Sequence, residues 1–310
     1  MSDLLSFASL AQLPSQDPAF FDVQYNNRAR VPDNAIHMAR WAALSRQVRE
    51  RGGWLEDLSY ADGEPGAYRE DERLDYFPAE PGAVAGQAPP LLVFLHGGYW
   101  RALDKRDHSL VASALPRCGV SVAVVNYSLC PAVTVETILL QAVRSVAWLY
   151  RAADRLGHDG SRIFVAGHSV GGHMAAMMLT TLWPRVGSDL PADLVKGVVS
   201  VSGLHDLEPL RRAAFLQVDL KLSESDVARL SPAFLPPATD APLVTAVGGL
   251  EPEEYQRQTD LLRAGWAANA AAPGAAHVPM PGRHHFNVMD DFAETDSPLL
   301  RAVLRMMDVA

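Results

Sequence analysis

The most informative chemical feature of this chain is a serine placed between two glycines. Ser169 lies between Gly167 and Gly171, directly after the apolar run 162–166 and before the small-residue segment 172–181. A strand-to-helix turn of this kind leaves no room for side chains at its flanking positions, and glycine relieves the clash. The serine hydroxyl then projects from the carboxyl end of the strand, where a reactant can reach it. The pattern predicts a nucleophilic serine.

A second glycine-rich segment lies upstream, at the end of the apolar run 91–95. There the chain reads His96, Gly97, Gly98, Tyr99, Trp100. Glycines let the backbone bend so that its N–H groups face one point, and such donors stabilise the oxyanion that forms when a serine attacks a carbonyl. An ordinary strand-to-loop turn is the alternative, but the serine motif downstream favours an oxyanion hole. Its donors would be backbone N–H groups of Gly97, Gly98, Tyr99 and Val170.

A serine hydroxyl is a poor nucleophile without a base, and the base needs a partner that holds its tautomer. In chains with this serine motif the order is serine, acid, histidine. His284 and His285 follow the last strand-like run. We favour His285 as the base, because Phe286 and Val288 behind it can anchor it against the core.

The acid is less clearly marked than the base. Glu251 follows the apolar run 243–247, where a carboxylate can turn toward His285. Asp206, after the preceding strand-like run, is a second candidate. Glu253 and Glu254 have another explanation, since acidic residues favour the positive end of a helix. We expect Glu251 to be the acid, with Asp206 as the alternative.

The elements that must position these groups begin with a helix over 34–51, two strands over 54–60 and 73–77, and a loop over 80–90 rich in proline and glycine. Strand-like and helix-like segments then alternate, and most of the strands are continuous apolar runs, as in parallel sheets covered on both faces. Strands are predicted over 91–95, 121–126, 162–166, 197–202, 243–247 and 276–280, and helices over 105–117, 135–156, 170–182, 252–268 and 298–307.

This alternation predicts a mostly parallel central sheet with helices on both faces. Together with the serine and glycine motifs, it predicts an α/β-hydrolase fold. We expect one domain over 1–310, with an N-terminal arm and first strands over 1–90. The segment 204–240 interrupts the alternation and is predicted to form a small cap-like insertion over the site.

Composition excludes several other classes of protein. The chain has 310 residues, 48% hydrophobic and 20% charged, which is typical of a globular protein. A net charge of −9 without basic clusters argues against a nucleic-acid partner. The start of the chain lacks a secretory pattern and no apolar run approaches about twenty residues, so we expect a cytoplasmic protein without a membrane partner. Cys118 and Cys130 suggest neither a disulfide framework nor a zinc site, and no metal or other cofactor is expected.

With these residues placed, the chain resembles the arylformamidases (kynurenine formamidases) of the α/β-hydrolase superfamily. The likeness covers nearly the whole chain. It is carried by segments 25–28 (Tyr-Asn-Asn-Arg), 96–100 (His-Gly-Gly-Tyr-Trp), 126–129 (Asn-Tyr-Ser-Leu), 167–173 (Gly-His-Ser-Val-Gly-Gly-His), 202–210 (Ser-Gly-Leu-His-Asp-Leu-Glu-Pro-Leu), 249–251 (Gly-Leu-Glu), 255–258 (Tyr-Gln-Arg-Gln) and 285–286 (His-Phe).

The resemblance implies hydrolysis of N-formylkynurenine to kynurenine and formate, in tryptophan degradation, without a metal. It also implies a catalytic set of Ser169, Glu251 and His285. Many relatives have aspartate where Glu251 stands, although this fold uses either acid. Tyr99 and Trp100, beside the oxyanion loop, are expected to wall an aromatic substrate.

Two alternatives remain open. A general carboxylesterase acting on small aryl or acyl esters would use the same machinery, because one scaffold hosts many chemistries. A non-catalytic binding protein on the same scaffold is the other, and the complete set of catalytic residue types argues against it. The expected partners are a small aromatic formamide or ester and, at most, a second copy of the chain in a homodimer.

Overall fold

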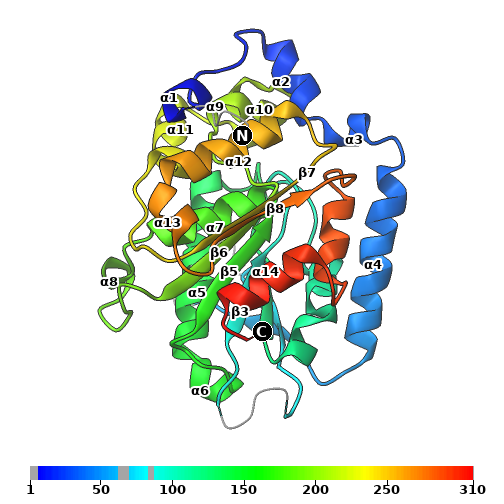
Figure 1. The fold of residues 1–310 in the computed structure, drawn as a ribbon, viewed down its shortest axis with the longest axis vertical. Helices are drawn as coiled ribbons and strands as arrows, with labels where there is room; N and C mark the ends of the chain where they lie inside the picture. The colour runs from blue at the N-terminus through cyan, green and yellow to red at the C-terminus, as the bar shows by residue number, and fades with distance from the viewer. Residues whose placement is uncertain (1–5, 62–69, 83–86, 310) are drawn as a thin grey trace.

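The computed structural model describes residues 6–61, 70–82 and 87–309, which are arranged around an eight-stranded sheet (Figure 1). The strand order is β1-β2-β4-β3-β5-β6-β7-β8. The pairs β1–β2 and β2–β4 are antiparallel, and every other neighbouring pair is parallel. The strands are β1 (Leu55–Ser59), β2 (Arg73–Phe77), β3 (Leu91–Leu95), β4 (Ser121–Val125), β5 (Ile163–His168), β6 (Val195–Val201), β7 (Leu243–Gly248) and β8 (Ala276–Met280).

The central strands are mostly apolar because both faces of the sheet are covered. Every residue of β3, β4 and β5 is buried. Side chains along a strand alternate between the faces, and β3 divides accordingly: Val93 packs in one core cluster, and Phe94 in the other. The predicted parallel sheet is therefore confirmed.

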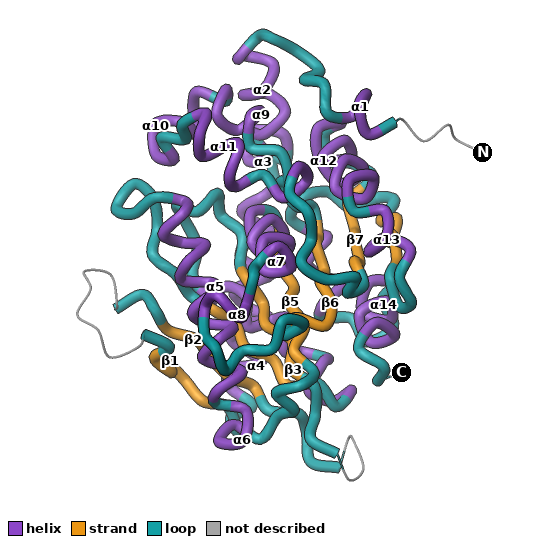
Figure 2. Tube along the Cα trace, turned by 90° about the vertical axis from the view of Figure 1, so that its left-hand side faces the viewer, coloured by secondary structure: helices purple, strands orange, loops and turns teal. Residues whose placement is uncertain are grey.

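Helices from different parts of the chain cover the two faces. On the face of Val93 lie α5 (Val135–Arg151), α7 (Val170–Thr180) and α12 (Glu253–Gly265). On the face of Phe94 lie α4 (Asn34–Glu50), η1 (Lys105–Ser113), η4 (Asn287–Phe292) and α14 (Pro298–Met306). Figure 2 shows α5 and α7 in front of the strands.

The eight predicted strands are present, with ends that differ from the prediction by up to two residues, but the helix predicted over 105–117 is wrong in kind. It forms two 3₁₀ helices, η1 and η2 (Leu115–Cys118). Pro116 lacks an N–H group and crowds the preceding turn, so an α-helix does not run through it. The helix predicted over 135–156 is divided at Ala152 into α5 and α6 (Ala153–Leu156). The predicted loop 80–90 has no regular element where it is described, and its residues 83–86 lie outside the described residues.

A layer of short helices lies beyond one end of the sheet. The segment 204–240 forms α9 (Glu208–Arg212), α10 (Ala214–Leu220), α11 (Glu224–Leu230) and η3 (Pro232–Phe234). The N-terminal helices α1 (Phe7–Leu10), α2 (Pro18–Tyr25) and α3 (Asn27–Arg30) lie at the same end (Figures 1 and 2). The two remaining helices are α8 (Trp183–Val186) and α13 (Ala267–Ala271). Among the described helices, none has the length and apolar character needed to cross a lipid bilayer.

Candidate active site

Ser169 occupies a strained turn between β5 and α7. Its φ is 58° and its ψ is −124°, a backbone conformation that non-glycine residues rarely adopt and that surrounding structure must enforce. The flanking glycines are required by close backbone contacts. A Cβ on Gly167 would lie 2.1 Å from the carbonyl oxygen of Gly171, and one on Gly171 would lie 1.9 Å from that of Leu95. The tight turn predicted from the glycine spacing is present.

His285 lies in the loop after β8, and its Nδ1 atom is 2.7 Å from Oε2 of Glu251, which follows β7. A carboxylate accepts only, so Nδ1 of His285 donates and Nε2 is left with a lone pair. The other oxygen of Glu251 accepts hydrogen bonds from Ser202 Oγ at 2.5 Å and from the amide of Gly248 at 2.7 Å. Both Glu251 and His285 are 6% exposed. The carboxylate is thus fixed in one orientation and in turn fixes the tautomer of the imidazole.

Asp206, the other candidate acid, has different partners. Its carboxylate lies 3.2 Å from Nη2 of Arg257 and accepts the amide of Glu208 at 3.1 Å. Burial raises the pKa of Asp206, and the charge of Arg257 opposes that rise. Asp206 therefore belongs to an ion pair beside α12, whereas Glu251 is paired with His285.

The loop Gly97–Gly98–Tyr99 is pressed against the serine turn. A Cβ on Gly97 would lie 3.1 Å from the carbonyl oxygen of His168 and 3.3 Å from Cβ of Ser169. Gly98 has a φ of 109°, and a Cβ there would lie 2.1 Å from the carbonyl oxygen of Ala102. Glycine is needed at both positions for the loop to approach so closely. The first amides of α7, beginning with Val170, have no partner within their own helix. The loop and the start of α7 therefore lie side by side next to Ser169.

Two buried histidine rings, those of His96 and His168, pack beside the serine turn and the glycine loop. The ring of His96 stacks on that of Tyr127 at 4.1 Å between centroids, and the Tyr127 hydroxyl donates to the carbonyl oxygen of His96 at 2.7 Å. Burial lowers the pKa of His96 to about 3. Burial also holds the pKa of His168 well below its usual value, and its ring lies 4.6 Å from that of His285. His96 and His168 thus act as neutral packing rings.

A cavity of about 480 Å³ opens above these groups, within the size range of small-molecule sites. Ser169 and His285 both line it, as do Gly98 and Tyr99. Its other lining residues are Tyr25, Asn26, Asn27, Arg28, Met38, Trp41, Arg101, Ala102, Leu103, His168, Phe215, Asp219 and Phe286. The structure therefore brings the predicted serine and histidine to one cavity, with part of the predicted oxyanion loop.

The expectation that Trp100 walls the cavity is wrong. Trp100 is fully buried in the core, where its ring meets that of His173 edge to face at 5.0 Å. A large aromatic ring gains most from complete removal from water, and this position under the loop provides it. Tyr99, the preceding residue, does line the cavity.

Tyr99 belongs to a hydrogen-bonded group that borders the cavity, and sequence reasoning assigned no role to its partners Tyr25, Asn27 and Tyr255. The hydroxyl of Tyr99 lies 2.7 Å from that of Tyr255 and donates to the carbonyl oxygen of Tyr25 at 2.7 Å. The side chain of Asn27 donates to the Tyr255 hydroxyl at 2.6 Å. The ring of Tyr255 lies 4.8 Å from that of His285. A signal was available, because these tyrosines and Asn27 stand within the family-like segments 25–28, 96–100 and 255–258.

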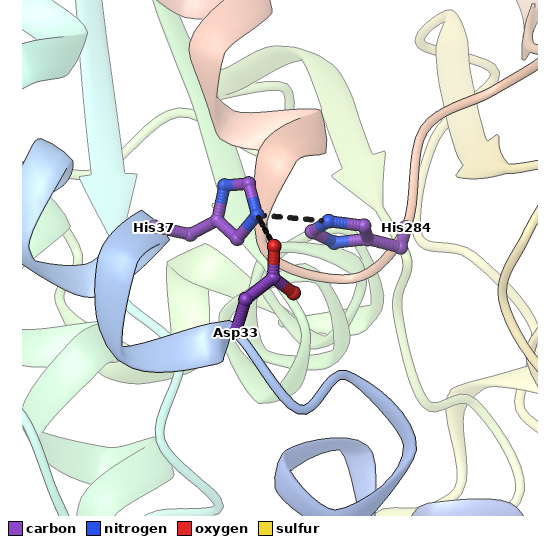
Figure 3. A group of neighbouring side chains, drawn as sticks. All are labelled: Asp33, His37 and His284. Carbon is purple, nitrogen blue, oxygen red and sulfur yellow. Dashed lines mark hydrogen bonds and ion pairs between the residues drawn. The ribbon is translucent and has the colours of Figure 1, made fainter.

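His284 does not line the cavity, and its ring lies beside that of His37 on α4 (Figure 3). Its Nε2 lies 3.2 Å from Nε2 of His37, which in turn lies 3.5 Å from Oδ2 of Asp33. The sequence had suggested no companion for His284. Asp33, His37 and His284 each offer one ligand atom, and these three atoms lie within 4.8 Å of one another, a spacing that could hold a metal ion.

The hydrogen bonds of His284 do not suit a metal. Its Nδ1 accepts from the amides of Phe286 and Asn287 at 3.2 and 3.3 Å. A neutral ring that accepts at Nδ1 carries its proton on Nε2, the atom that would have to bind the metal. The contact to His37 instead joins α4 to the loop of His285. Nε1 of Trp41 donates to the carbonyl oxygen of Phe286 at 3.1 Å and adds a second link. We call these two contacts the α4 clamp.

Comparisons with known proteins identify the family of the chain. A family model described as the alpha/beta hydrolase fold matches residues 92–254. The kynurenine formamidase of Salmo salar is 30% identical over 93% of this chain and 94% of its own length. A crystal structure of a protein from Silicibacter sp. tm1040 has a TM-score of 0.76 and 32% identity, covering 91% of this chain and 98% of that one. The ethyl acetate hydrolase of Pseudomonas putida is 36% identical over 36% of this chain and 34% of its own length. The chain is therefore a hydrolase that belongs to the kynurenine formamidase family of the α/β hydrolases.

Proposed function

We propose that this protein hydrolyses the formamide of N-formylkynurenine to give kynurenine and formate, with Ser169 as nucleophile, His285 as base and Glu251 as acid. The observation that carries the proposal is the pairing of His285 with the buried Glu251 at the cavity that Ser169 lines. The kynurenine formamidase relative aligns along almost the whole chain, which favours this substrate over others of the superfamily.

The first half of the reaction forms a formyl-enzyme. Ser169 Oγ attacks the formyl carbon while Nε2 of His285 takes the hydroxyl proton. The carbonyl oxygen becomes an oxyanion, held by amides of the Gly97–Tyr99 loop and of Val170. His285 then gives the proton to the arylamine nitrogen, the C–N bond breaks, and kynurenine leaves with its amine restored.

The second half repeats the chemistry with water. His285 takes a proton from water as its oxygen attacks the formyl-serine, and then returns a proton to Ser169 Oγ as the ester bond breaks. Formate is released and the free serine is regenerated. Glu251 stays ionised and stabilises the imidazolium in both halves. One oxyanion donor contributes about 3 kcal/mol to such reactions.

The aromatic part of the substrate is assigned to the rings around the cavity. Tyr99, Phe215 and Trp41 line it, and aromatic side chains provide large apolar contact with a second ring. The helices of segment 204–240, which contribute Phe215, serve in this proposal as a cap on the single domain 1–310.

The second candidate is a carboxylesterase that acts on small esters. The identity with an ethyl acetate hydrolase favours it, although that match covers 36% of this chain. Measuring kcat/KM for N-formylkynurenine beside that for a simple aryl ester separates the two. A clear preference for the formamide supports the proposal, and no preference assigns the protein to general esterases.

The remaining alternative, a binding protein without catalysis, makes a different prediction. A fluorophosphonate probe reacts only with an activated serine, so labelling of Ser169 in the intact protein supports a working active site. Absence of labelling, together with absence of turnover, contradicts the proposed mechanism.

A further inference from the structure

Arg28 is a cavity-lining cation of a different kind from its neighbours. It lies in α3, is exposed, and borders the same cavity as Ser169. Within the described residues, its guanidinium takes part in no ion pair or hydrogen bond. Arg101, the other arginine of the lining, is 2.6 Å from Asp219 and donates to the carbonyl oxygen of Phe215 at 2.8 Å. Arg101 is therefore already neutralised, whereas Arg28 has its donors available.

The backbone that carries Arg28 is fixed relative to the reactive groups. Its neighbour Asn27 is 5% exposed and binds the Tyr255 hydroxyl at 2.6 Å. Tyr255 in turn packs against His285. On the other side, the side chain of Asn34 donates to the carbonyl oxygen of Arg28 at 3.0 Å. A cation on such a support can orient a ligand with little loss of conformational freedom.

The charges of the lining point to an anionic group on the substrate. Besides His285, whose partner is Glu251, the charged lining residues are Arg28, Arg101 and Asp219. Since Arg101 and Asp219 form a pair, one positive charge is left over, on Arg28. A guanidinium presents parallel N–H donors that match the two oxygens of a carboxylate. Ser169 is 2% exposed at the floor of the cavity, and the exposed Arg28 lies nearer to solvent.

We infer that Arg28 binds the carboxylate of the substrate and so selects aryl formamides that carry an amino-acid side chain. This inference rests on the proposed function, since N-formylkynurenine has its formamide on the aromatic ring and its carboxylate at the far end of the attached chain. With the formyl carbon at Ser169, the carboxylate extends toward the open side of the cavity. Simple aryl esters make no use of Arg28.

The test compares two substrates that differ by the carboxylate. Wild type and Arg28→Gln are assayed on N-formylkynurenine and on N-formylkynurenamine, which lacks that group. A charged hydrogen-bonded contact corresponds to a change of about 10- to 100-fold in affinity. We therefore expect Arg28→Gln to lower kcat/KM for N-formylkynurenine by about 10- to 100-fold more than it lowers kcat/KM for N-formylkynurenamine. Equal losses on the two substrates overturn the inference, because a structural defect affects both.

Arg30→Gln is the matched control. Arg30 lies in the same short helix and is exposed, but it does not line the cavity. Its substitution by glutamine removes the same charge as Arg28→Gln. We expect it to keep the wild-type preference for the carboxylate within about twofold, whereas Arg28→Lys keeps part of it. If Arg30→Gln loses as much of this preference as Arg28→Gln does, the positive charge of the helix acts on the substrate at long range, which contradicts direct binding by Arg28.

A binding measurement separates this inference from the proposed function. Kynurenine and kynurenamine are tested as competitive inhibitors of aryl-ester hydrolysis, which requires no formamidase activity. Arg28→Gln is expected to weaken inhibition by kynurenine about 10-fold or more relative to kynurenamine. Wild type that fails to cleave N-formylkynurenine but shows this pattern refutes the proposed function and keeps the carboxylate site. Inhibition that does not depend on the carboxylate refutes the site.

Discussion

His284 and His285 are adjacent in the chain, yet they bind elements on opposite sides of their loop. Nδ1 of His285 donates to Glu251 after β7, whereas Nε2 of His284 lies against His37 of α4. The loop is thus fixed from both sides, and the imidazole at the cavity has one orientation. In the proposed mechanism the two histidines have separate roles: His285 takes part in the chemistry and His284 positions its loop.

Replacement of Glu251 tests the role of the ionised carboxylate. Glu251→Gln keeps the size of the side chain but removes its charge and permits the wrong imidazole tautomer, so kcat is expected to fall about 10⁴-fold. Glu251→Asp keeps the charge on a shorter arm, and we expect a loss of about 10- to 100-fold. Steady-state kinetics on N-formylkynurenine measures both. If the amide variant is as active as the aspartate variant, charge is irrelevant and the assignment is wrong.

Loss of the His37 contact of the α4 clamp is predicted to affect the rate more than binding. His37→Ala removes the partner of His284 and loosens the loop that carries His285, which is expected to lower kcat about 10-fold while KM changes less. Ile36→Ala is a matched control, because this neighbour on α4 is 67% exposed. A kcat for His37→Ala equal to that of the control shows that the loop does not depend on the His37 contact.

Trp100→Ala tests the reassignment of this residue to the core. Removing a fully buried indole leaves a cavity, and the free energy of unfolding is expected to fall by about 3–5 kcal/mol. Urea denaturation followed by fluorescence of the other tryptophans measures this loss. A variant with wild-type stability and a raised KM would restore Trp100 to the substrate site.

The buried histidines predict that stability falls in mild acid. Burial lowers the pKa of His96 to about 3 and that of His173 to about 4, whereas an unfolded chain takes up these protons near about pH 6.5. The unfolded state binds more protons below that value, so the stabilisation is complete above about pH 6.5 and declines toward about pH 4. Urea midpoints between pH 7.5 and 5 should therefore decrease, and less steeply in His173→Gln. An identical slope in that variant contradicts the neutral state of His173.

Much of this fold could be predicted because parallel strands buried on both faces leave continuous apolar runs. The fully buried run of β3 appears with the predicted boundaries. The serine turn was recognisable for a local reason, since Gly167 and Gly171 avoid backbone overlap. Features that depend on distant residues were not recognisable. Both Glu251 and Asp206 follow strands. Only the fold shows that Asp206 pairs with Arg257 and that Glu251 pairs with His285.

The same limit explains the errors. Nothing near Trp100 in the sequence indicates His173 as its packing partner, because the contact forms only when the loop folds over α7. The partnership of His37 with His284 spans most of the chain for the same reason. The family-like segments 25–28 and 255–258 contain residues of the hydrogen-bonded group that borders the cavity, but the sequence did not indicate what these residues do. Their hydrogen bonds join separate elements and form only in the fold.

Formyl transfer to Ser169 is the step on which the whole account depends, and it can be observed directly. Wild type and Ser169→Ala are mixed with N-formylkynurenine, quenched early, and examined by peptide mass spectrometry while kynurenine and formate are quantified. The account predicts a transient formyl group on the peptide containing Ser169, equal amounts of the two products, and a loss of turnover of at least about a thousand-fold in Ser169→Ala with the fold retained. Turnover that survives in Ser169→Ala, or a formyl group carried by another residue, would contradict it.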